Sequence, residues 1–72
     1  MPKLPVVSGQ ELVRILIEKK GYQIRSRKGS HVILIHSVLS PLTVPMHREI
    51  RPGLLLSIIK TAGLEREELS RR

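Results

Sequence analysis

Apolar side chains recur at helical spacing in two stretches of the chain. In the first, aliphatic residues occupy one helical face between positions 12 and 17. Ser8 followed by Glu11 is a capping-box pattern, which is typical of a helix start. Lys20 and Gly21 are typical of a helix end, because a cation favours the negative end of the dipole and glycine accepts the terminating conformation. We therefore predict a helix from about Ser8 to Lys20.

The second helical stretch begins at Pro52, a residue suited to the first turn of a helix. Its apolar stripe consists of Leu54, Leu55, Ile58, Ile59 and Ala62. Gly63 ends the pattern. The segment that follows, residues 65–72, is strongly charged. There we expect either a short helical turn around Leu69 or a frayed end.

Three strands are predicted between the helices. Tyr22–Arg27 alternates in the manner of a half-buried strand, and Lys28-Gly29 is a turn signal. Ser30–His36 then forms a second strand, antiparallel to the first. Leu42–Pro45 is a short third strand, which its proline ends or places at an edge.

This order predicts an α+β fold of the type α-β-β-β-α, with a three-stranded antiparallel sheet and two helices on one face. We expect a single domain over residues 1–72, with an extended segment at 1–7 and a charged tail at 65–72. Strand alternation places toward the helices Tyr22, Ile24, Val32 and Leu34. It leaves on the open face Arg25, Arg27, His31, Ile33 and Ile35.

The second strand carries more apolar side chains than a half-solvated strand needs, since positions 32–35 are all aliphatic. We therefore predict that Ile33 and Ile35 contact a partner, either a second copy of the chain in a homodimer or an antagonist protein. The alternative is that the C-terminal tail folds over them.

The net charge of the chain indicates which kind of partner it binds. Thirteen Lys and Arg against six acidic residues give a net charge of +7, which favours a polyanion such as nucleic acid or a membrane surface. No apolar run approaches the roughly 18 residues of a membrane span. The first residues do not resemble a signal peptide. We expect a cytoplasmic protein without a membrane partner.

Two residue classes that often carry chemistry are scarce in the chain. Cysteine is absent, which excludes disulfides and thiolate catalysis. Tyr22 is the single aromatic residue, which argues against a base-stacking platform.

The candidate chemistry centres on His31, which follows a basic arm and a glycine turn. Histidine is the side chain whose ordinary pKa lies near neutrality, and the 2′-hydroxyl of RNA offers a proton for it to take. The expected RNA contacts around it are Arg25, Arg27, Lys28, Gly29 and Ser30. No carboxylate flanks His31, which favours transesterification without a metal or other cofactor. Residue types alone leave two alternatives open. His31 could be a surface or capping histidine, and the basic arm of Arg25, Arg27 and Lys28 could be only a solvated face.

The other two histidines are weaker candidates. His47 and Arg48 lie in a basic connector and are further expected RNA contacts. For His47, contact with phosphate or with an antagonist protein and a plain surface position are equally expected. His36, at a strand end, is expected to be structural, and Tyr22 to fill the core. A zinc site built from the three histidines is not expected, because they lack close ligand spacing and a carboxylate partner.

Four short motifs in order resemble those of the HicA family of toxin mRNA interferases. They are Gly21-Tyr22, Gly29-Ser30-His31, Thr43-Val44-Pro45-Met46-His47, and the helical segment from Arg51-Pro52-Gly53 to Lys60-Thr61-Ala62-Gly63-Leu64. The resemblance implies a double-stranded-RNA-binding-like fold and ribosome-independent cleavage of mRNA. It also implies that His31 is the catalytic residue and that a HicB-type antitoxin binds and blocks the toxin. The chain departs from the family where Val32, Ile33 and Ile35 stand at positions that are often polar.

The leading interpretation is therefore an RNA-cleaving toxin of a toxin–antitoxin pair. A non-catalytic RNA-binding module, in which His31 only contacts phosphate or the 2′-hydroxyl, is the second. An interaction domain that docks through the apolar sheet face is the third. No base-reading residue stands out, so the sequence predicts no cleavage specificity.

Overall fold

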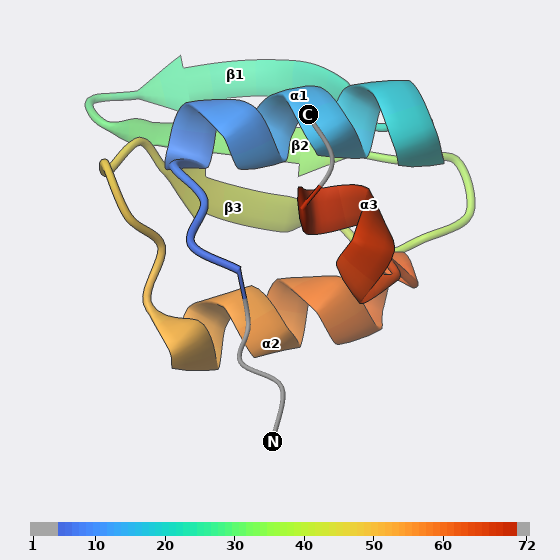
Figure 1. Ribbon diagram of the computed structural model, residues 1–72. Coiled ribbons are helices and arrows are strands. Elements are labelled where there is room, and N and C mark those ends of the chain that lie inside the picture. Colours follow the sequence, from blue (N-terminus) through green and yellow to red (C-terminus); the bar gives the residue numbers. More distant parts are fainter. Residues whose placement is uncertain (1–4, 71–72) are drawn as a thin grey trace.

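The structure, a computed structural model, describes residues 5–70. Its elements are α1 (Gly9–Lys20), β1 (Gln23–Lys28), β2 (His31–Ile35), β3 (Leu42–Pro45), α2 (Pro52–Ala62) and α3 (Arg66–Ser70) (Figure 1). The predicted helices and strands are confirmed to within one or two residues, and the charged tail forms α3 rather than fraying. The predictions for residues 1–4 and 71–72, at the extended start and in the tail, lie outside the described residues.

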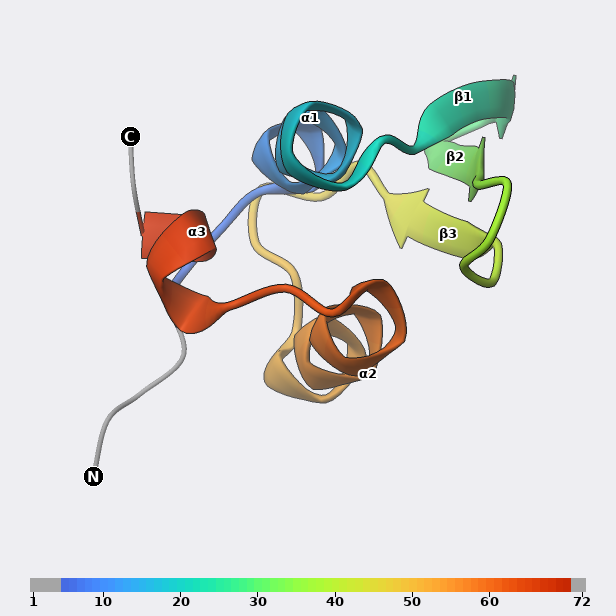
Figure 2. The ribbon, with the colours of Figure 1, turned by 90° about the vertical axis from the view of Figure 1, so that its right-hand side faces the viewer.

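The sheet is antiparallel with the order β1-β2-β3, and the helices lie on one side of it. In Figure 2, α1 and α2 cover one face of the sheet, and α3 lies between them on the side away from the strands. The fold predicted from the sequence is confirmed. Aliphatic side chains from both layers fill the space between sheet and helices, and the most deeply buried are Leu12, Leu16, Val32, Leu34, Val44, Leu55 and Ile58.

Local signals in the sequence account for the ends of α1. The Ser8 hydroxyl accepts a hydrogen bond from the Glu11 backbone N–H (3.1 Å), and the Glu11 carboxylate accepts one from the Ser8 backbone N–H (2.9 Å). This reciprocal pair satisfies N–H groups that a helix start otherwise leaves open. Gly21 ends α1 in the left-handed conformation, with φ at 79°.

The first residue of α1 lies against the end of β3. The Gly9 backbone N–H donates to the carbonyl of His47 at 2.9 Å. A Cβ atom at Gly9 would stand 2.1 Å from the carbonyl oxygen of Pro45 and 2.8 Å from the Cα of Met46. Only glycine fits there, so this residue sets how closely α1 approaches the sheet.

A β-bulge interrupts the pairing of β1 with β2. Ile24 pairs with Leu34, and Ser26 pairs with Ile33, so Arg25 is an extra residue in β1. Ile24 lies on the helix side, as predicted, but its side chain is 53% exposed. It is exposed because β1 is an edge strand and its outer part extends beyond the cover of the helices (Figure 2).

Beyond the bulge, β1 presents its side chains to the opposite faces from those that simple alternation predicts. Arg27 pairs with the buried Val32, and Lys28 pairs with His31. Because paired residues share a face, Arg27 lies on the helix side and Lys28 on the open side. The prediction that Arg27 shares the open face with His31 is therefore wrong, since one inserted residue reverses the alternation.

Tyr22 and His36 stabilise the end of the sheet that lies away from His31. Tyr22 is 1% exposed, and its hydroxyl donates to the carbonyl of Ser40 at 2.8 Å. Burial raises the pKa of the Tyr22 phenol, which keeps it protonated as a donor. The ring of His36 packs against the ring of Tyr22 with centroids 4.8 Å apart. Both residues thus have the structural positions expected of them.

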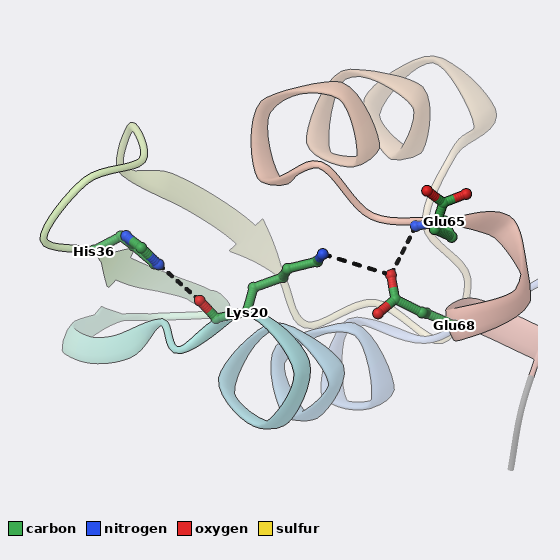
Figure 3. Close-up of polar contacts among 4 residues, drawn as sticks. All are labelled: Lys20, His36, Glu65 and Glu68. Atoms are coloured by element: carbon green, nitrogen blue, oxygen red, sulfur yellow. Dashed lines mark hydrogen bonds and ion pairs between the residues drawn. The ribbon is translucent and has the colours of Figure 1, made fainter.

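The imidazole of His36 joins the loop after β2 to the end of α1. Its Nδ1 accepts hydrogen bonds from the backbone N–H groups of Val38 (2.9 Å) and Leu39 (3.0 Å), so the ring proton is on Nε2. Nε2 donates to the carbonyl of Lys20 at 2.7 Å. Figure 3 shows this bond and, on the other side of Lys20, the ion pair of its ammonium with Glu68 in α3.

Candidate functional site

His31 opens β2 directly after the turn at Gly29 and Ser30. Gly29 has a φ of 57°, a conformation that glycine adopts without strain. The His31 side chain is exposed, and its ring makes no hydrogen bond to any of residues 5–70. The fold therefore holds the backbone of His31 within the sheet, through pairing with Lys28 and Pro45, and leaves the imidazole available to a ligand.

Two cations share this region of the sheet with His31. Lys28 stands directly across the strand pair from it. Arg25, the extra residue of the bulge, opposes Ile33 together with Ser26, one step further along the same face. Both side chains are exposed. The open face thus combines an unengaged imidazole with an ammonium and a guanidinium group.

The part of the sequence that forms the sheet contains basic residues but no acidic ones. All six acidic residues are glutamates, and none of them falls between positions 19 and 48. That range contains the whole sheet, the β1–β2 turn and the first residues after β3. Such a distribution favours the binding of polyanions to the sheet.

The remaining predicted RNA contacts, Arg27, His47 and Arg48, lie together but on the helix side. They line a hollow of about 410 Å³, here called the basic hollow, whose other residues are Ser8, Gln10 and Met46. Its lining residues come from the start of α1, the end of β1 and the segment after β3. These segments lie at the same end of the sheet (Figure 1). The sequence does not indicate that Ser8, Gln10 and Met46 lie near Arg27. Arg27 lies on their side of the sheet because of the bulge, and the residue types of β1 do not reveal the bulge.

Ile33 and Ile35 lie on the open face and are half-buried. Ile33 stands between Ser26 and Thr43, while Ile35 pairs with Gln23 at the far end of β1. The α3 helix packs on the helix side, so the alternative in which the tail covers these two residues is wrong as far as residue 70 (Figure 2). Their partner remains a prediction.

Residues 5–70 contain neither a membrane-spanning helix nor a metal-binding cluster. No helix there is both long enough and apolar enough to cross a bilayer. No three His, Asp or Glu side chains in that range come close enough together to hold a metal ion.

Comparison with known families gives a match over most of the chain. The model of the family described as the HicA toxin of bacterial toxin–antitoxin systems matches residues 9–64, well over half of the chain. The matched range begins with Gly9 and includes His31, the bulge and His47. No curated protein and no solved structure gave a match.

Proposed function

Because the chain belongs to the HicA toxin family, we propose that it is an endoribonuclease that cleaves mRNA with His31 as the proton-transfer group. The observation that carries the proposal is the unengaged imidazole of His31, which stands at a strand start beside Lys28 on a sheet without acidic residues. The family also implies a cognate antitoxin.

In this reaction, the imidazole of His31 takes the proton of an RNA 2′-hydroxyl. The 2′-oxygen then forms a bond to the adjacent phosphorus, and the bond from phosphorus to the 5′-oxygen breaks. The 5′-oxygen takes up a proton, either from the imidazolium or from water. The products are a 2′,3′-cyclic phosphate and a 5′-hydroxyl. Lys28 and Arg25 bind the phosphate oxygens and offset the negative charge that develops on them.

The route makes a direct prediction about the substrate. Because the nucleophile is the 2′-hydroxyl and the proton acceptor is a side chain, we expect cleavage to continue in excess EDTA and to stop on RNA that carries 2′-O-methyl groups. Mass spectrometry of the fragments should identify cyclic phosphate ends. Loss of activity in EDTA that Mg²⁺ restores, or cleavage of 2′-O-methyl RNA, would show that the mechanism is wrong.

A non-catalytic RNA-binding module is the second candidate, and the cationic sheet supports it equally well. The same assay separates the two, since a binding module would retain RNA on the protein without producing fragments. An interaction domain that binds no RNA would give neither result.

We further propose that a HicB-type antitoxin covers the open face and so blocks access to His31. Ile33 and Ile35 lie on that face and offer an apolar surface that such a partner can bury. A homodimer through the same surface is the alternative, and light scattering on the isolated chain distinguishes them, because a monomer leaves the face open for the antitoxin.

Replacement of both isoleucines should weaken this contact. We expect Ile33→Thr/Ile35→Thr to raise the Kd for the antitoxin about tenfold or more, because apolar anchors contribute most of an interface's free energy. Threonine keeps the preference for a strand. The control is Val38→Thr, an exposed residue of the loop after β2, and titration calorimetry measures both. Equal affinity of the double variant and the control would place the antitoxin elsewhere.

A further inference from the structure

We propose that the basic hollow binds a phosphate of the nucleotide next to the one cleaved at His31. An RNA strand would then run from the open face, around the turn at Gly29 and Ser30, to the helix side. The inference rests on the proposed function and adds to it a second subsite, with Arg27 and Arg48 as its phosphate ligands.

The hollow lies close to His31 because both belong to the same end of the sheet. His31 pairs with Pro45 of β3. The next residue, Met46, donates its backbone N–H to the carbonyl of Ser30 in the β1–β2 turn, and Met46 lines the hollow. The turn and the segment after β3 are therefore joined, with His31 on one face of the sheet and the hollow on the other.

The bulge in β1 determines on which face of the sheet Arg27 lies. In a strand without the bulge, regular alternation from Ile24 would place Arg27 on the open face with His31. With the bulge, Arg27 pairs with Val32 and lies on the helix side. There it lines the hollow together with His47 and Arg48, which belong to the segment after β3. Cations from two distant parts of the sequence thus converge at one concave place.

These converging cations have no counter-ion among residues 5–70. Neither Arg27 nor Arg48 forms an ion pair with a carboxylate in that range, and both are exposed. Bringing like charges together is unfavourable unless an anion neutralises them. The guanidinium group binds phosphate through two parallel hydrogen bonds, so two arginines with an imidazole beside them form a suitable phosphate site.

The lining also indicates which part of a nucleotide binds. No Phe, Tyr or Trp lines the hollow, so the small ring of His47 is the only ring in its lining that a base could stack on. The ligand class is therefore the sugar-phosphate backbone of a single strand. Contacts of this kind position a strand without reading its sequence, so the subsite should increase affinity equally for all sequences.

A binding experiment on uncleavable RNA tests the subsite without requiring catalysis. The probe is a short 2′-O-methyl RNA, and the variant is Arg27→Gln/Arg48→Gln. The control is Lys60→Gln/Arg66→Gln, which removes the same charge from exposed positions on α2 and α3. We expect the first variant to bind about tenfold more weakly. Its slope of log K against log salt should be shallower by about 0.7 for each phosphate of the single strand that the variant no longer neutralises.

The control should change the affinity less than twofold. If both variants weaken binding equally, net charge alone is responsible and the subsite does not exist. Circular dichroism and thermal unfolding should show that both variants are folded. A variant that unfolds is replaced by Arg27→Lys/Arg48→Lys, which keeps the charge and removes the paired hydrogen bonds, and unchanged affinity in that variant counts against the subsite.

Cleavage kinetics supply an independent measurement. A dinucleotide has only the phosphate that is cleaved, whereas a trinucleotide extended on either side has one more. For the unmodified chain, we expect one of the two extensions to raise kcat/KM about tenfold through KM, and Arg27→Gln/Arg48→Gln to bring this ratio toward one. If the unmodified chain cleaves no RNA at all, the proposed function fails, and the binding of 2′-O-methyl RNA still decides whether the subsite exists.

Discussion

Replacement of His31 by alanine should lower kcat for RNA cleavage by about 10²–10⁴-fold, the usual contribution of a general acid–base group. The fold should be unaffected, because the imidazole is exposed and makes no hydrogen bond to residues 5–70. The rate is measured with the purified chain on a defined RNA, and circular dichroism confirms that the variant is folded. In bacteria, the growth arrest caused by the unmodified chain should disappear.

His47→Ala is the matched control, since His47 is also an exposed histidine at the same end of the molecule. Its ring lines the basic hollow, so its loss should act on KM, by about tenfold or less, and leave kcat nearly constant. Added imidazole should restore part of the rate to His31→Ala, because a free imidazole can carry the proton. If His31→Ala is folded and remains fully active, His31 is not catalytic.

Gly9→Ala should lower the free energy of unfolding by about 3 kcal/mol, at the upper end for overpacking of a tight contact. The added Cβ would stand 2.1 Å from the Pro45 carbonyl oxygen, and backbone atoms cannot move aside as a side-chain end can. α1 would have to move away from β3 and lose the bond from Gly9 to His47. Folded domains are stable by only about 0.05–0.15 kcal/mol per residue, so this loss is large for a short chain.

Gly53→Ala provides the control, because Gly53 also lies in the first turn of a helix but has nothing within 4 Å of an added Cβ. Alanine there should raise the free energy of unfolding by about 0.5–1 kcal/mol, as helix propensity predicts. Urea denaturation followed by circular dichroism measures both. A lower free energy of unfolding for Gly9→Ala together with a higher one for Gly53→Ala would support the close approach of α1 to β3. A Gly9→Ala protein as stable as the unmodified chain would contradict it.

The parts of this fold that the sequence predicts well depend on neighbours along the chain. Ser8 and Glu11 start α1, Gly21 and Gly63 end their helices, and Pro52 opens α2, each by contacts within a few residues. The order of these signals is enough to predict the topology. The motif around Gly29 also places His31 correctly at the start of a strand.

The errors arise where two distant strands determine each other's geometry. The bulge at Arg25 depends on how β1 pairs with β2, and residue types alone give no sign of it. A single inserted residue moves every later side chain of the strand to the opposite face. That is why simple alternation groups Arg27 with His31, and why it does not reveal the basic hollow. The requirement for glycine at position 9 likewise depends on Pro45, far away in the sequence.

The bulge also affects how the sheet meets other copies of the chain. As an edge strand, β1 presents backbone N–H and C=O groups that could pair with a strand of another molecule. Arg25 interrupts the regular spacing of these groups, and Arg27 and Lys28 add charge beside them. Edge-to-edge pairing through β1 is therefore disfavoured. With the function proposed above, a chain released from its antitoxin would then remain dispersed, with its open face accessible to RNA.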